Sequence, residues 1–158
     1  MADKREQILV RLVEIAEAIP GIKTVERNPG QLDETVLPAI VILDADETAD
    51  DADPGGPRGR PPFAPRRVGM TPEIYLMALA PTPEPGESSS AKLGPLINGM
   101  RAQFVKAVLT DASLREIVGT NGDIRYEGCA TALARGRSME AEMGVSFTFS
   151  YMLKPSDL

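Results

Sequence analysis

The chain of 158 residues contains no histidine, no tryptophan and a single cysteine. Without histidine it lacks the commonest general base, the commonest metal ligand and the base of every Ser-His or Cys-His nucleophile pair. With Cys129 alone it cannot form a disulfide within the chain, so nothing indicates an oxidising compartment. No apolar run approaches the roughly 20 residues of a membrane-spanning helix. We therefore expect neither a histidine-based active site nor a membrane segment.

What is present is typical of one globular domain, and we expect residues 1–158 to form it. Hydrophobic residues make up 42% of the chain and charged residues 25%, with a net charge of −6. An acidic chain without a dominant basic patch is a poor candidate for gripping a phosphate backbone. The opening residues resemble neither a signal peptide nor a transit peptide, which favours a cytoplasmic location.

The segment from Met139 to Leu153 alternates strictly between apolar and polar side chains. A period of two predicts a strand that packs one face on a core and turns the other outward. At about 3.3 Å per residue this strand would be roughly 50 Å long, well beyond the usual 5–6 residues. We expect its ends to bend or project, with a neighbouring subunit meeting the polar face and the end at 139–143.

The remaining elements alternate between helical and strand periodicity. Asp3 and Glu6 have the spacing of a capping box, and Asp111 is placed to cap a short helix. Helices are predicted at 3–19, 88–109 and 112–118, and strands at 22–27, 36–43, 68–80, 124–131 and 139–153. This order predicts an α+β domain: a mainly antiparallel sheet with two main helices on one face and a short third helix.

Residues 44–67 fit none of these patterns. Acidic residues are frequent in the first half and basic residues in the second, and prolines and glycines are frequent from Pro54 onward. Such a segment buries too little apolar area to offset its ordering entropy. Connections this long inside a compact domain are usually functional or disordered. We interpret 44–67 as a long mobile arm between two adjacent strands.

A search for catalytic chemistry finds no candidate. Glu140 and Glu142 would lie about 6.6 Å apart on one strand face, but any i, i+2 pair on a solvated strand does so. Arg135 and Arg137, in a predicted hairpin turn, suit either solvent or an acidic neighbour, and Cys129 is expected to be a small buried residue. The acidic tract lacks the EF-hand spacing and would attract divalent cations only weakly. We expect no enzyme and no cofactor.

The features that remain, an overlong strand and a charge-segregated arm, are typical of assembly. Free strand edges pair with partners, and arms that order on binding wrap around neighbours. The residues expected at a subunit or partner interface are Asp44, Asp46, Glu47, Asp50, Asp51, Asp53, Arg58, Arg60, Arg66, Arg67, Arg135, Arg137, Glu140 and Glu142.

Several stretches together resemble the tail terminator (tail completion, minor tail protein) family of long-tailed bacteriophages, prophages and gene-transfer particles. They are Lys4–Leu9, Ile19–Val25, Leu37–Val41 ahead of the acidic tract, Met70–Tyr75, Lys106–Asp111, Ile124–Cys129 and Ala134–Glu140 leading into the alternating strand. The resemblance is one of overall amino-acid sequence and covers most of the chain, apart from the arm and residues 81–90.

The resemblance implies a structural virion protein. Such proteins form a hexameric ring on the head-proximal end of a finished tail tube, where they stop tube polymerisation and present a surface to the head connector. The implied partners are further copies of the chain, the tail tube protein and a neck protein, with DNA passing the lumen without specific binding. The implied location is the host cytoplasm during assembly and then the virion tail. An acidic lumen would repel DNA, and Asp44–Asp53 are a candidate lining.

Two alternatives stay open. One is another neck or head–tail joining protein with a similar domain, which a gene beside the portal gene rather than the tail tube gene would favour. The other is a small binding domain or an enzyme that works through carboxylates. A monomer with a deep acidic pocket would favour the second.

Overall fold

The computed structural model describes residues 3–30, 36–49, 64–80, 82, 84–88, 91–133 and 140–158. The elements in chain order are α1 (Lys4–Glu17), β1 (Thr24–Arg27), β2 (Ala39–Ala49), β3 (Arg66–Leu79), α2 (Leu93–Leu109), α3 (Ala112–Val118), β4 (Asp123–Leu133), β5 (Glu140–Leu153) and a 3-10 helix, Pro155–Asp157. No helix in these ranges is both long and apolar enough to cross a membrane.

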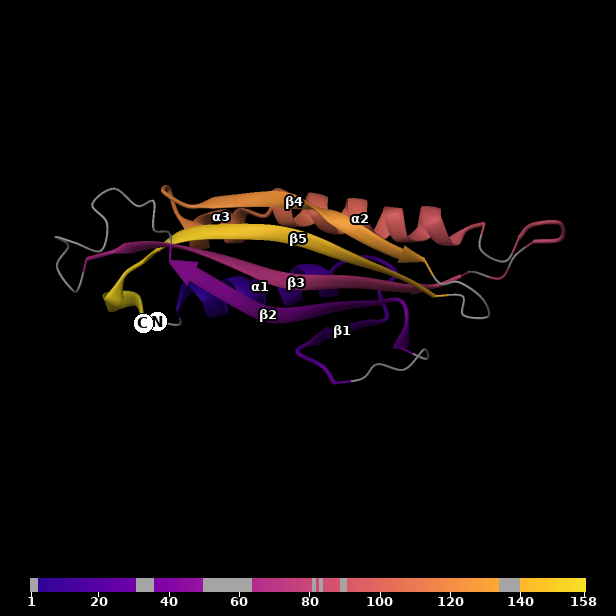
Figure 1. Ribbon diagram of the computed structural model, residues 1–158, viewed down its shortest axis with the longest axis horizontal. Coiled ribbons are helices and arrows are strands. Elements are labelled where there is room, and N and C mark those ends of the chain that lie inside the picture. The colour runs from indigo at the N-terminus through magenta and orange to yellow at the C-terminus, as the bar shows by residue number, and fades with distance from the viewer. Residues whose placement is uncertain are drawn as a thin grey trace.

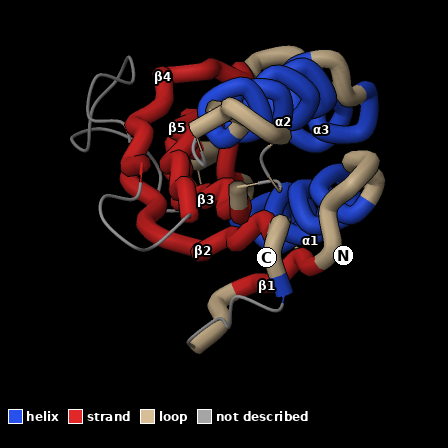
Figure 2. Tube along the Cα trace, turned by 90° about the vertical axis from the view of Figure 1, so that its right-hand side faces the viewer, coloured by secondary structure: helices blue, strands red, loops and turns tan. Residues whose placement is uncertain are grey.

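The strands form one five-stranded sheet, and the helices cover one of its faces (Figures 1 and 2). The strand order is β1-β2-β3-β5-β4, in which only the β1–β2 pair is parallel. The predicted α+β class, a mainly antiparallel sheet with helices on one face, is confirmed. The start of α1 and the 3-10 helix lie at the same end of the molecule (Figure 1).

The core lies between the sheet and the helices. On β5 every second side chain from Ala141 to Tyr151 is buried, as the alternation predicts. Phe147 meets Phe104 of α2 edge to face, with ring centroids 6.2 Å apart and an interplanar angle of 77°. The period-two strand and the 3.6-period helix therefore meet along their apolar sides.

The structure corrects the expected projection of the long strand. β5 is a central strand, and its first residues are paired on both sides: Glu140 with Leu79 of β3, and Ala141 also with Leu133 of β4. β3 has the same length of 14 residues and runs antiparallel beside β5, so the two strands cover each other end to end. Met139 lies outside the described residues.

The bounds of the expected arm are also corrected. β2 continues to Ala49 and β3 begins at Arg66, so residues 44–49 and 66–67 belong to strands. Residues 46–49 of β2 pair with residues 68–71 of β3, and this ladder bonds the backbone groups that face β3 despite the acidic side chains. The central part of the expected arm, 50–63, lies outside the described residues.

Side-chain caps define two helix starts. Asp3 Oδ1 accepts hydrogen bonds from the backbone N–H groups of Arg5 and Glu6 at 2.6 and 3.4 Å, and Asp111 Oδ2 accepts one from Leu114 at 2.8 Å. α2 begins at Leu93 rather than at residue 88, because its first turn takes up Pro95, which is tolerated there.

Candidate functional site

The stem is the end of the sheet where residues 46–49 of β2 pair with residues 68–71 of β3. The chain leaves the described part of the molecule at Ala49 and returns at residue 64, so the stem carries the segment 50–63. β5 continues along β3 beside it, since Tyr151 pairs with Val68. β4 follows on the far side of β5, since its residues 123 and 124 pair with Ser150 and Phe149, so the stem is four strands wide at Gly69 and Met70.

An arginine on β1 holds the base of the stem. Arg27 Nε and Nη2 donate to the Asp44 carboxylate at 2.7 and 2.8 Å, while Nη1 and Nη2 donate to Glu6 at 2.8 and 2.9 Å. These bonds lower the pKa of both Asp44 and Glu6 below their ordinary values, because the guanidinium favours the charged carboxylates. One cation thus joins β1, β2 and α1.

A second arginine supports an irregular turn of β2. The ladder between β2 and β3 shifts register between Leu43 and Asp46, and Ala45 adopts a left-handed conformation with φ of 50°. Arg5 Nη2 of α1 donates to the carbonyl oxygens of Asp44 and Ala45 at 3.2 and 2.6 Å. The bulge therefore turns its carbonyls toward a cation that satisfies them.

Tyr151 of β5 forms a further hydrogen bond to β2, from the core side of the sheet. Its side chain is fully buried, and its hydroxyl donates to Glu47 of β2. Burial, followed by the hydrogen bond to Glu47, raises the pKa of Tyr151 far above its ordinary value. Glu47 and Asp44, both expected at an interface, thus make bonds within the subunit.

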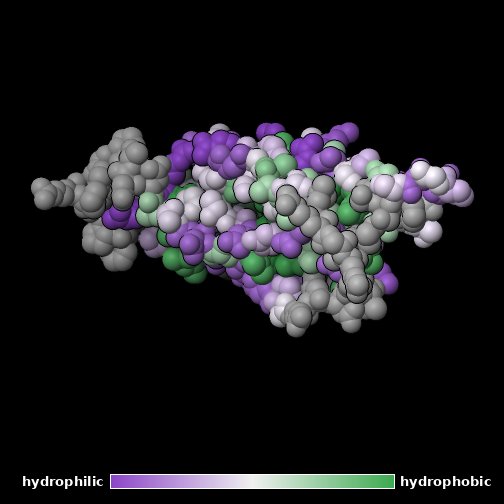
Figure 3. Space-filling view, turned by 45° about the vertical axis from the view of Figure 1, so that its right-hand side comes forward, coloured by the Kyte–Doolittle hydropathy of each residue, from purple (hydrophilic) through white to green (hydrophobic). Residues whose placement is uncertain are grey.

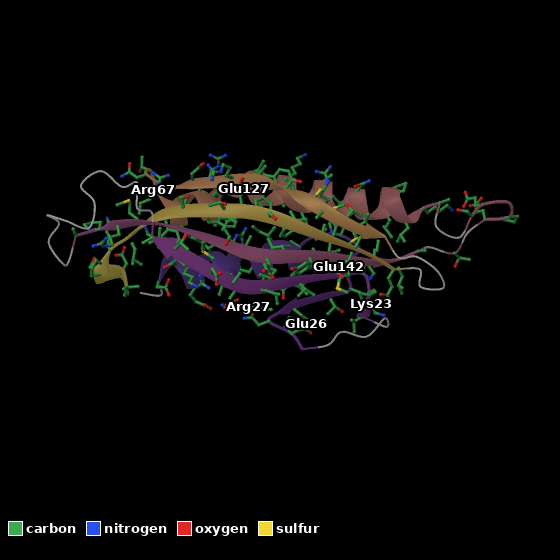
Figure 4. The ribbon with its side chains drawn as sticks, in the orientation of Figure 1. Lys23, Glu26, Arg27, Arg67, Glu127 and Glu142 are labelled. Atoms are coloured by element: carbon green, nitrogen blue, oxygen red, sulfur yellow. The ribbon has the colours of Figure 1, made fainter. Side chains whose placement is uncertain are left out.

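The face of the sheet away from the helices is the open face, and it contains a hollow of about 480 Å³. Figure 3 shows hydrophilic side chains interspersed with small apolar areas on this side. The hollow spans β3, β5 and β4, and its outward-facing lining is Thr71, Glu73, Tyr75, Gly144, Ser146, Thr148, Glu127 and Ala130. Glu127 and Glu142 stand at different points along this face in Figure 4.

The polar groups of the open face bond to one another. Glu127 accepts hydrogen bonds from Arg125 at 2.6 Å and from Thr148 at 2.9 Å. The Tyr75 hydroxyl donates to Glu73 at 3.1 Å, and this bond raises the pKa of Tyr75. These bonds link neighbouring polar side chains of a face that carries more acidic than basic groups.

A tyrosine ring covers part of β5. A side-chain carbon at Gly144 would lie 3.6 Å from the nearest ring atom of Tyr75, an ordinary van der Waals contact, so the ring packs over the strand without requiring the glycine. Within the described residues, no cluster of three or more histidine, cysteine, aspartate or glutamate side chains is placed to hold a metal.

The predicted interface residues fall into four groups. Asp46 and Arg66 are exposed at the stem, with Arg67 partly exposed beside them. Glu140 and Glu142 lie at the opposite end of β5. Asp44 and Glu47 form the network described above, and Asp50, Asp51, Asp53, Arg58, Arg60, Arg135 and Arg137 lie outside the described residues.

Sequence reasoning missed Arg5, Arg27 and Tyr151, because no local spacing relates them to their partners. It was also wrong about Cys129, which is exposed. β4 carries a bulge between Tyr126 and Gly128 and forms the edge of the sheet, so the residues beyond the bulge have no neighbouring strand on one side in the described structure.

Comparison with known proteins adds no relative: no protein-family model matches the chain, and no curated protein matches it.

Proposed function

We propose that this protein is a tail terminator, a structural subunit that assembles with further copies into a ring on the end of a phage-type tail tube. The ring, a hexamer in the family that the sequence resembles, stops tube polymerisation and presents a surface to the head connector. The protein acts by contact and not by catalysis.

The braced stem is the observation that carries this proposal. Hydrogen bonds to β2 from Arg5, Arg27 and Tyr151 hold this strand in place where the charged segment 50–63 departs. A segment that reaches a neighbour from a fixed base loses less conformational freedom on binding than one that departs from a loose base. A network of this kind is expected where an arm transmits force or position between subunits.

The charge of the open face supports a place for it along the DNA path. Its outward-facing carboxylates outnumber its arginines along the described strands: Asp46, Glu73, Asp123, Glu127, Glu140 and Glu142 against Arg67 and Arg125. An acidic wall repels a polyanion and keeps it from sticking. We therefore assign the open face, in place of the acidic tract alone, to the lumen of the ring.

Electron microscopy of particles made without this protein tests the proposal. Removing the gene from the phage, prophage or gene-transfer particle that encodes it is expected to give tails of uncontrolled, excessive length that do not join heads. Supplying the protein in trans is expected to restore the normal length. Tails of normal length that fail to join heads would instead indicate another neck protein, and normal particles would overturn the structural role.

A further inference from the structure

The two edges of the sheet differ in length and in charge. β1 is four residues long and ends in Glu26 and Arg27. β4 has 11 residues and pairs, among the described strands, only with β5. Edge strands expose unpaired backbone groups, which proteins usually protect with charges, proline, a bulge or a short length. β1 is protected by its short length and its charged residues, so β4 is the edge that could pair with another chain.

Protection on β4 is confined to its first half. Asp123, Arg125 and Glu127 carry its charges, and the bulge lies between Tyr126 and Gly128. The half beyond the bulge reads Gly-Cys-Ala-Thr-Ala over residues 128–132, without charge or proline, and residues 129–132 are all exposed. Regular pairing with β5 resumes at Gly128, so among the described residues this half forms an edge without a partner strand.

The helices leave the same half accessible. Arg101 of α2 reaches β4 at the Tyr126 hydroxyl, 3.5 Å away, which is before the bulge. Beyond the bulge, Cys129 and Thr131 share the helix-side face with Val145 and Met143 of β5 in the pairing register, yet both are exposed. Small side chains on both faces leave room for another backbone alongside.

We propose that this edge pairs with the same edge of a second copy of the chain, antiparallel and centred on Ala130. Backbone groups of residues 128–132 would then bond across a two-fold axis and join the two sheets into one. The contact is isologous and closes on two copies, so it goes beyond the proposed ring, whose head-to-tail contacts must use other surfaces.

Charge favours this occupant and this register. Centring on Ala130 places Cys129 opposite Thr131 and Gly128 opposite Ala132 of the other copy, so only uncharged residues meet. Glu127 then lies opposite Leu133 of the other copy, far from the Glu127 of that copy. Centring on Gly128 would instead bring the two Glu127 side chains to diagonal positions about 7–8 Å apart, where like charges repel. The uncharged stretch is therefore self-complementary about its midpoint.

Solution mass under reducing conditions provides the first test. By light scattering at about 100 µM, the protein is expected to show twice the 16.9 kDa of one chain, because a Kd near 1 µM would leave little monomer. Ala130→Lys places two ammonium groups face to face and is expected to raise the Kd at least tenfold, so that in a dilution series from about 100 to 1 µM its mass falls to that of one chain at a higher concentration than the wild type's. Gln103→Lys adds the same charge to an exposed site on α2 and is expected to leave the mass unchanged.

Cross-linking provides a second test, which reports the register of the contact directly. Residues directly opposite in an antiparallel pair have Cα atoms about 4.5–5.5 Å apart, within the range that a disulfide spans. In a Cys129→Ala background, Ala130→Cys is expected to form a dimer on mild oxidation at least tenfold faster than Gln103→Cys.

Equal cross-linking rates, a monomer at 100 µM, or a dimer that Ala130→Lys leaves intact would each overturn the pairing. A larger assembly in which residue 130 does not cross-link would overturn it too. Tail length, which tests the proposed function, is measured independently.

Discussion

Tyr151 and Tyr75 each donate a hydrogen bond to a glutamate, but from opposite faces of the sheet. Tyr151 is fully buried in the core, whereas Tyr75 is partly exposed on the open face. At the residue scale, burial decides what each bond contributes. A partner left unsatisfied away from water costs about 1–3 kcal/mol, while an exposed one regains water.

Tyr151→Phe is expected to lower the free energy of unfolding by about 1–3 kcal/mol, because Glu47 loses its donor at a partly buried site. Urea unfolding followed by circular dichroism measures the change. Tyr75→Phe is the matched control, and we expect it to cost less than about 0.5 kcal/mol. Equal costs for the two substitutions would show that the Tyr151–Glu47 bond contributes no more than an exposed one.

Two glycines should respond oppositely to alanine. Gly99 lies in α2 with nothing within 4 Å of an added side-chain carbon, so Gly99→Ala is expected to stabilise by about 0.5–1 kcal/mol through helix propensity. At Gly122 the added carbon would lie 2.3 Å from the Val118 carbonyl oxygen, so Gly122→Ala must displace backbone. Thermal unfolding should show a higher Tm for the first variant and a lower Tm for the second. A higher Tm for Gly122→Ala would contradict the packing described here.

Residue-level prediction from the sequence succeeded where the partners are close along the chain. Asp3 and Asp111 cap helices as their spacing indicates. Arg27 bonds to Glu6 and Asp44, 21 and 17 residues away, and only the packing of β1 between α1 and β2 brings them together. No local pattern carries that information.

At the scale of elements, the Arg27 network makes the attachment of α1 to the sheet sensitive to pH. The pKa values of Glu6 and Asp44 are lower in the folded protein than their ordinary 4.5 and 3.8. Groups with depressed folded pKa values stabilise the fold above their unfolded pKa, and this stability is lost as the pH falls through the folded pKa.

Arg27→Met is therefore expected to destabilise the protein at pH 7, and the difference from the wild type should shrink as the pH falls below about 4.5. Urea unfolding across pH 2–7 measures it. Arg11 also lowers the pKa of Asp111, but this contribution to the pH dependence is the same in the wild type and the variant, so it cancels in their difference. Arg66→Met at the exposed stem is the control and should show a pH-independent difference. A difference that stays constant for Arg27→Met would exclude the carboxylates as its cause.

Strand existence was predictable from period-two alternation, but strand ends and neighbours were not. The acidic residues after Leu43 hid the second half of β2, because ladder bonds and Arg5 stabilise a strand that composition disfavours. The alternation of β5 likewise indicated a buried face without showing that β3 and β4 flank it. A pattern in one strand specifies which face is apolar and leaves its partners unspecified.

The corrected bounds of β2 and β3 yield a paired deletion. Replacing residues 50–63 by a short Gly-Ser linker is expected to preserve the Tm within a few degrees, because the described core and the β2–β3 ladder are both kept. Replacing residues 46–66 is expected to lower the Tm, since Glu47 and part of the ladder are lost. If the first variant also unfolds early, the segment contributes to folding and not only to assembly. If it caps tails normally, the proposed role of the segment is wrong.

At the scale of the whole molecule, the sheet is a plate with different surfaces for different contacts. Helices occupy one face, the acidic open face is the other, the stem lies at one end, and β4 has no partner on one side among the described strands. The sequence predicted assembly through the overlong strand and the arm 44–67, and we now propose the stem, the open face and β4 as the contact surfaces. Each of these surfaces can be altered without touching the core, so their roles are separable.

The ends of the chain lie at the same end of the molecule as the stem, and Asp3 of α1 is near enough to Tyr151 of β5 to raise its pKa. A circular permutant therefore needs only a short linker between the old ends, with new ends opened inside 50–63. Such a protein would keep every described pairing and cut the segment at the tip of the stem into two free tails. If it folds and still caps tails, the segment acts as two independent tails; if it folds but does not cap them, the segment works as a closed loop.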